Sequence, residues 1–279
     1  MSKTYIFKPV MEHGELQKAV DLQVDTWGRE IVTALAQLVA AIHNGGCVIG
    51  AYDSDRMIGF VYGFPGITDI SKKPHLVSHM MAVDSDYRNQ GIGESLKRRQ
   101  REWAIEKGYE KITWTFDPLE IKNGYLNLSK LGGYVRTYYV SYYGITQDKI
   151  NKGMPTDRFL LEWDLLSEPV VNAGMKKEKY GNISDYPLAL DFSIQDSLPV
   201  SGDVVRRDGE KVLLVPAPKD IQALKNRSFE LAYDWRMKIR QAIQALFSDG
   251  YVLVAAIPSD DVGYYILEKE TRNTKRSGK

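Results

Sequence analysis

Residues 88–93, RNQGIG, have the types and the spacing that could hold a phosphate group. They follow a predicted strand over 75–83 and open a predicted helix that ends at Gly108. Glycines let a backbone approach a ligand closely, and the first N–H groups of a helix have no intrahelical acceptor. The helix dipole adds roughly half a positive charge at the same end. We therefore expect this segment to bind a pyrophosphate.

Two common nucleotide-binding motifs do not fit this segment. A P-loop ends in Gly-Lys-Ser/Thr, whereas Gly93 is followed by Glu94 and Ser95, so the lysine that reaches a terminal phosphate is missing. A Rossmann fingerprint needs a third glycine, and Leu96 stands at that position. The phosphate ligand is therefore not predicted to be a nucleotide of either kind.

The segment resembles motif A of the GNAT N-acetyltransferase superfamily, Arg/Gln-x-x-Gly-x-Gly/Ala after a strand that ends in Val. A second family signature, Lys-Leu-Gly at the end of the next helix, is matched at 130–132, and the resemblance covers about residues 5–165. The segments SHMMAV, WTFDPL and DRFLLEW also look like a bacterial group of predicted GNAT acyltransferases with a C-terminal extension. The resemblance implies an α+β fold, in which a mixed and mostly antiparallel sheet is flanked by helices.

The resemblance also implies a co-substrate, acetyl-coenzyme A or another acyl-coenzyme A, and no metal. In the family the glycine loop holds the pyrophosphate. The preceding strand is often kinked by a bulge, which exposes backbone N–H groups that bond the pantetheine arm and polarise the thioester carbonyl. The residues expected to contact the cofactor are Met81, Ala82, Val83, Arg88, Asn89, Gln90, Gly91, Ile92, Gly93, Glu94 and Asn127. The charged residues of the following helix are expected mainly to form a solvated face, while one or two of them could contact the adenosine 3′-phosphate; they are Lys97, Arg98, Arg99 and Arg101.

Two residues are candidates for the base that deprotonates an amine. His79 stands four residues before Val83, a spacing that resembles the histidine proposed as general base in arylalkylamine N-acetyltransferases of this superfamily. Imidazole titrates near the pH at which an alkylamine must lose its proton. The alternative is a buried, hydrogen-bonded structural histidine. Asp117, after the predicted strand 111–116, is the second candidate base or amine-positioning carboxylate, with an Asp-Pro turn as its alternative role.

The general acid of the family is missing from this sequence. Many members have a tyrosine three residues before the Leu of Lys-Leu-Gly, and here that residue is Leu128. Tyr125, one turn earlier, is a candidate substitute. Further candidates are Tyr138, Tyr139, Tyr142 and Tyr143, which are also typical of a well-packed strand. The leaving thiolate can also take its proton from the amine or from water, so catalysis does not strictly need this acid.

The chain before motif A has the order expected of the family: strand, two helices, hairpin and strand. The expected elements are 5–10, 15–27, 30–43, 47–53 and 57–64. In the family the first two helices line the acceptor side, so Trp27 and Phe64 are candidate substrate contacts. The alternative is that both are ordinary packing residues.

The chain is predicted to divide into a GNAT domain over 1–165, a linker-like stretch over 166–205 and a smaller C-terminal α/β unit over 206–279. On a predicted helix of that unit, Arg236 and Arg240 are four residues apart and share a face, so they could hold a carboxylate of a substrate. The alternative is a solvated face, on which Glu230 and Asp234 pair with the two arginines.

Composition excludes several classes of protein. The formal net charge of +1 disfavours nucleic acid as the main partner. The sequence has no apolar run of roughly 18 residues and no N-terminal apolar segment, so we expect no membrane partner and a cytoplasmic protein. The single cysteine, Cys47, excludes an internal disulfide. It is a weak candidate for an acyl-enzyme nucleophile, because it lies in an apolar strand without an obvious base.

Two function classes follow from these residues. The first is an N-acyltransferase that moves an acetyl or other acyl group, such as succinyl, to a primary amine of a small molecule, for example an amino acid. The second is a non-catalytic module that binds or senses acyl-coenzyme A. The identity of the amine and the existence of a homodimer are left open by the sequence.

Overall fold

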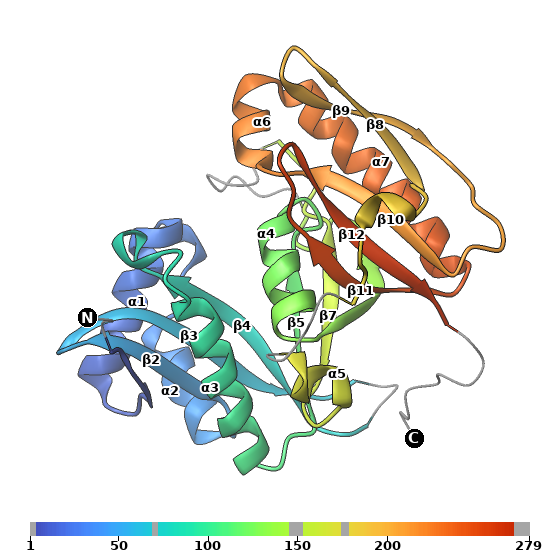
Figure 1. Cartoon of the computed structure of the whole chain (residues 1–279). Helices are drawn as coiled ribbons and strands as arrows, with labels where there is room; N and C mark the ends of the chain where they lie inside the picture. Colours follow the sequence, from blue (N-terminus) through green and yellow to red (C-terminus); the bar gives the residue numbers. More distant parts are fainter. Residues whose placement is uncertain (1–3, 69–71, 145–152, 174–178, 271–279) are drawn as a thin grey trace. The chain divides into compact units, whose positions relative to one another are not determined.

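The computed structural model describes residues 4–68, 72–144, 153–173 and 179–270. The chain forms two compact units (Figure 1). Unit 1 comprises Met1–Trp114 and Trp163–Ser167, and unit 2 comprises Thr115–Glu162 and Glu168–Lys279. This division differs from the predicted boundary at 165, because residues 115–162 belong with the C-terminal unit.

Unit 1 has the predicted GNAT order of elements at its start. Its elements are β1 (Ile6–Pro9), α1 (His13–Trp27), η1 (Arg29–Ile31), α2 (Leu35–His43), β2 (Cys47–Asp53), β3 (Arg56–Gly66), β4 (His75–Val83), η2 (Ser85–Tyr87), α3 (Ile92–Glu106) and the first part of β5 (Lys111–Phe116). The strand order is β1-β2-β3-β4-β5, antiparallel except for the parallel pair of β4 and β5. The mixed, mostly antiparallel sheet predicted for this unit is confirmed.

The second helix of unit 1 is shorter than predicted, since α2 begins at Leu35 and residues 29–31 form a separate 3-10 turn. Val32 has an extended backbone after that turn. The side chain of Gln23 on α1 accepts a hydrogen bond from Thr33 N (2.8 Å) and donates one to Thr33 O (3.5 Å). These bonds take backbone groups that a continuous helix would use.

Helices cover both faces of the unit 1 sheet. Helices α1 and α2 pack against the face that carries Phe60 and Tyr62. Helix α3 lies against the other face, where β3 has Gly59 and Gly63. A Cβ on Gly63 would stand only 3.0 Å from the Gln100 side-chain nitrogen on α3. The two glycines therefore let α3 approach the sheet closely.

A β-bulge interrupts β4, as the family resemblance predicts. The register of β3 and β4 steps from Tyr62 opposite Met80 to Gly63 opposite Ser78, which leaves His79 as the extra residue. A bulge reverses the side-chain alternation that follows it. Residues on either side of the bulge therefore do not share the face that an unbroken strand would give them.

The bulge separates His79 from Met81. The His79 ring lies against Phe64 on the face that α1 and α2 cover. The Met81 Cε lies 3.6 Å from the position that a Cβ on Gly93 of α3 would take. An unbroken alternation, in which both side chains point to one face, is thus not found.

Unit 2 contains the predicted C-terminal strands and helix. Its elements after β5 are α4 (Ile121–Gly124), the π-helix η3 (Tyr125–Lys130), β6 (Tyr134–Tyr139), β7 (Arg158–Asp164), α5 (Glu168–Val171), η5 (Ile183–Asp185), β8 (Leu190–Gln195), β9 (Leu198–Val204), β10 (Val212–Pro218), α6 (Ile221–Arg227), α7 (Phe229–Ser248), β11 (Tyr251–Ile257) and β12 (Val262–Lys269). The last residues of β7 belong to unit 1. The strand order in unit 2 is β7-β6-β11-β12-β10, with β8 and β9 as a separate hairpin.

The stretch 166–205, predicted to be a linker, carries secondary structure in its described part. It contains α5, η5 and the hairpin of β8 and β9. The hairpin packs on α7, where Trp235 Nε1 donates a hydrogen bond to Pro199 O (2.9 Å).

Candidate functional site

The glycine loop before α3 has the geometry of an anion site. Gly91 is the N-terminal cap of α3 and has a left-handed backbone with φ +80° and ψ 0°. Asn89 also has a positive φ of 61°. No described atom lies within 4 Å of a Cβ built on Gly91, and only Met81 Cε lies that close to one on Gly93. The positions that a Cβ would take at these two glycines are therefore largely free of protein atoms, which fits close approach by a phosphate group at the start of the helix.

Neighbouring side chains hold the loop in place. Arg88 Nε donates to Val83 O (3.2 Å), which ties the loop to the end of β4. Gln90 accepts a hydrogen bond from the Tyr5 hydroxyl (2.6 Å), and its Nε2 donates to Asp86 O. The Glu94 carboxylate pairs with Arg98 one turn along α3 (2.9 Å). The structure thus brings the predicted cofactor residues 81–83 and 88–94 together, and it places Asn127, buried in η3, in unit 2.

His79 is exposed, and its imidazole lies between two aromatic rings. Ring centroids are 6.2 Å apart for Tyr62 and His79 and 5.7 Å apart for Phe64 and His79, both edge-on. The lost hydration beside these rings lowers the pKa of His79 below its usual value, because the charged form is the better hydrated one. The imidazole is therefore neutral near pH 7 and able to accept a proton. A buried structural histidine does not describe this residue.

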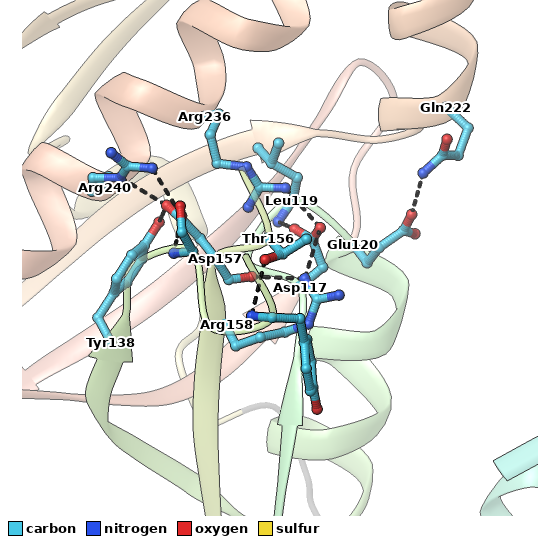
Figure 2. Close-up of polar contacts among 12 residues, drawn as sticks. Asp117, Leu119, Glu120, Tyr138, Thr156, Asp157, Arg158, Gln222, Arg236 and Arg240 are labelled. Carbon is cyan, nitrogen blue, oxygen red and sulfur yellow. Dashed lines mark hydrogen bonds and ion pairs between the residues drawn. The ribbon is translucent and has the colours of Figure 1, made fainter. Parts of the chain in front are cut away.

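Asp117 is held by partners that make it a poor base. Its Oδ1 accepts a hydrogen bond from Leu119 N (2.7 Å), which forms the turn named above as its alternative role. Its Oδ2 accepts from Arg236 Nη2 at 2.7 Å and lies 3.5 Å from Arg158 Nη1 (Figure 2). Burial alone would raise the pKa of Asp117, but the two guanidinium groups and the N–H bond together lower it. A carboxylate with a lowered pKa binds a proton weakly, so the catalytic role is not supported.

Arg236 and Arg240 do not form a solvated pair on α7. Arg236 is 2% exposed and bonded to Asp117. Arg240 Nε and Nη2 each donate to a carboxylate oxygen of Asp157, both at 2.8 Å (Figure 2). Asp234, predicted as a partner, instead accepts a hydrogen bond from Ser201. The sequence could not indicate this, because Asp117 and Asp157 lie far from α7 along the chain.

The candidate tyrosines have other partners. The Tyr138 hydroxyl donates to Asp157 (2.6 Å), and burial together with that carboxylate raises its pKa, which weakens it as an acid. The Tyr143 hydroxyl lies 3.2 Å from Thr115 Oγ1. Tyr139 and Tyr142 stack on one another with centroids 4.8 Å apart. Tyr125 begins η3 and has Lys130 Nζ 5.8 Å from its ring centroid.

Trp27 and Phe64, the predicted substrate contacts, are partly buried and pack against the core cluster of α1, α2 and the sheet. Phe64 also contacts His79, so the structure joins one predicted substrate contact to one predicted base. The Cys47 thiol is buried, and burial raises its pKa to about 12, which removes the thiolate that a nucleophile needs. No group of three or more metal-ligating side chains, and no helix able to cross a membrane, occurs among the described residues.

The sequence analysis placed Lys97 on the solvated face of α3, whereas the structure buries it. The side chain is 3% exposed. The indication was present, since Lys97, Gln100 and Ala104 follow the spacing of a helix face and the other two are small or uncharged. All three are buried.

Residues 16–122 match the family model described as "Acetyltransferase (GNAT) family". These residues therefore form a domain that is similar to the GNAT acetyltransferases.

Similar solved structures include the ribosomal-protein-S18-alanine N-acetyltransferase from Escherichia coli, at 15% identity and a TM-score of 0.47, covering 58% of this chain and 94% of that chain. An N-acetyltransferase from Staphylococcus aureus Mu50 has 15% identity and a TM-score of 0.48, covering 58% and 99%. A putative acetyltransferase from Salmonella typhimurium with its cofactor acetyl-CoA has 14% identity and a TM-score of 0.48, covering 58% and 94%. No curated protein matches the chain.

Proposed function

We propose that this protein is an N-acyltransferase that moves an acetyl or other acyl group from coenzyme A to a primary amine of a small molecule, by direct attack of the amine. One observation carries the proposal. The bulge in β4 places the His79 imidazole on the face that α1 and α2 cover, while Met81, just beyond the bulge, lies beside the glycine loop of α3. A proton acceptor and an anion site thus occupy opposite faces of one strand.

Each group has a role in this proposal. The N–H groups at the start of α3, from Gly91 to Gly93, would bind the pyrophosphate of acyl-coenzyme A. The thioester supplies an activated acyl group when the cofactor is bound. Backbone N–H groups after the bulge, near Met81, would polarise the carbonyl. The His79 imidazole would take the proton that the attacking amine loses, and its lowered pKa keeps it neutral for this task.

A second candidate is a module that binds acyl-coenzyme A without catalysis. Leu128 favours it, because this fully buried apolar residue stands where many family members have a tyrosine acid. The two candidates share the glycine loop and differ in turnover.

Coenzyme A release with a panel of amines, amino acids included, tests the proposal with acetyl- and succinyl-coenzyme A as donors. We expect release with at least one amine, and an about 100-fold lower kcat in His79→Ala with little change in cofactor affinity. His13→Ala, at the exposed start of α1, is the matched control and should keep wild-type rates. Binding of acyl-coenzyme A without turnover on any amine would favour the sensor.

A further inference from the structure

Lys97 is a buried lysine without a counter-ion. Its Nζ donates a hydrogen bond to Ser78 Oγ at 2.6 Å and stands 3.6 Å from the ring centroid of Trp114. Within the part of the chain that the structure describes, no carboxylate pairs with it. Burial of an unpaired ammonium is costly, so a purely structural role would be better served by an apolar side chain.

The hydrogen bonds around Lys97 fix its direction. The Ser78 hydroxyl donates its own hydrogen to Gln100 Oε1 (2.8 Å), so its oxygen is left to accept from Lys97. Gln100 Nε2 in turn donates to Cys47 Sγ at 3.7 Å. The Cys47 thiol on β2 is the titratable group that faces Lys97, and its raised pKa keeps it neutral. Nζ is thus held at one point and can still lose a proton.

Lys97 Nζ lies where the pairing of β4 with β5 ends. The two strands pair at Leu76 with Ile112 and at Val77 with Thr113, and the next residue on each strand is Ser78 and Trp114. Lys97 contacts both of these next residues, from the α3 side. The bulge residue His79 follows Ser78 directly. Two groups that carry protons therefore flank β4 at the same level, His79 on one face and Lys97 on the other.

We propose that Lys97 is the general acid of the acyl transfer, in place of the tyrosine that is absent at Leu128. The inference rests on the proposed function. As the acceptor nitrogen bonds to the acyl carbon, the C–S bond breaks, the sulfur takes the electron pair, and Lys97 Nζ gives it a proton. His79 takes the proton of the amine. The starting state returns when the imidazolium loses its proton to water and the Lys97 amine takes one up.

The acidity of Lys97 suits this step. Burial lowers its pKa to about 7, so a substantial fraction is ammonium near neutral pH. An ordinary thiol has a pKa of about 8.5, so transfer from Nζ to a thiolate is downhill. Tyr138, in contrast, has a raised pKa and is bonded to Asp157.

The test compares the binding of coenzyme A with that of desulfo-coenzyme A, by calorimetry between about pH 6 and 9. In the wild type we expect the sulfur to add affinity, because the thiol of coenzyme A contacts Nζ. Lys97→Met should lose this added affinity while keeping wild-type affinity for desulfo-coenzyme A. Its rate of acyl transfer should fall about 100-fold. Lys107→Met, exposed at the end of α3, is the matched control.

Two results would overturn the inference. One is equal wild-type affinity for coenzyme A and desulfo-coenzyme A, a measurement that needs no variant. The other is a Lys97→Met protein that transfers acyl groups at the wild-type rate, in which case the acyltransferase stands without this acid. Absence of turnover with every amine, alongside the affinity added by the sulfur, would instead count against the proposed function alone. Ser78→Ala, which removes the acceptor that holds Nζ, should also reduce the affinity added by the sulfur.

Discussion

The buried ion pair of Asp117 and Arg236 in unit 2 predicts different losses of stability for variants of each residue. Asp117→Asn leaves a guanidinium that is 2% exposed and whose Nε and Nη1 already have no hydrogen-bond partner among the described residues. Breaking a buried ion pair costs roughly 3–5 kcal/mol. We expect Asp117→Asn to lower the free energy of unfolding by about 4–5 kcal/mol, because the buried guanidinium of Arg236 loses the carboxylate that balances its charge.

Arg236→Met should cost less, about 2–3 kcal/mol, for two reasons. Asp117 keeps Arg158 at 3.5 Å and the Leu119 N–H. The methionine also removes two unsatisfied donors, each of which carries a penalty of about 1–3 kcal/mol. The double variant, Asp117→Asn with Arg236→Met, should cost no more than Asp117→Asn alone.

Urea unfolding of the four proteins, followed by circular dichroism and tryptophan fluorescence, measures these free energies. Arg206→Met is the matched control, since Arg206 forms an exposed ion pair with Asp208 and should change stability by less than about 0.5 kcal/mol. An Arg236→Met protein as stable as this control would refute the argument. So would an Arg236→Met protein less stable than Asp117→Asn.

Three further predictions concern unit 1. Gly93→Val should lower coenzyme A affinity at least tenfold in calorimetry without loss of fold, because the new side chain starts beside Met81 alone and fills the space in front of the loop; Gly14→Val on α1, also in open space, should bind as the wild type does. The wild-type kcat/KM should rise with pH through a value below the usual histidine pKa, because His79 must be neutral, and persistence of that rise in His79→Ala would exclude it as the base. The unfolding free energy of the wild type should rise by a few kcal/mol from about pH 7 to pH 10.5, because the unfolded chain holds the proton that folded Lys97 has lost, and a Lys97→Met protein with the same slope would contradict this burial.

The sequence by itself determined the local parts of this protein. Strand, glycine loop and helix between 75 and 108 follow from side-chain periodicity and from the left-handed backbone that Gly91 permits, and each of these depends on residues close in the chain. The helix predicted in the C-terminal unit was found as α7 for the same reason, with Trp235 and Ile239 buried. Local patterns of this kind can be recognised without knowing which residues pack against the element.

Only the tertiary structure decided which charges are buried and which partners they have. Asp117 meets Arg236 across 119 positions of sequence, and Asp157 meets Arg240 across 83, so neither pairing leaves a local pattern. The face of His79 depends on one residue of register between β3 and β4, which pairing of the two strands sets. The charge of Lys97 does not distinguish it from its arginine neighbours on α3, and it is buried because Ser78 on β4 and Trp114 on β5 lie against it.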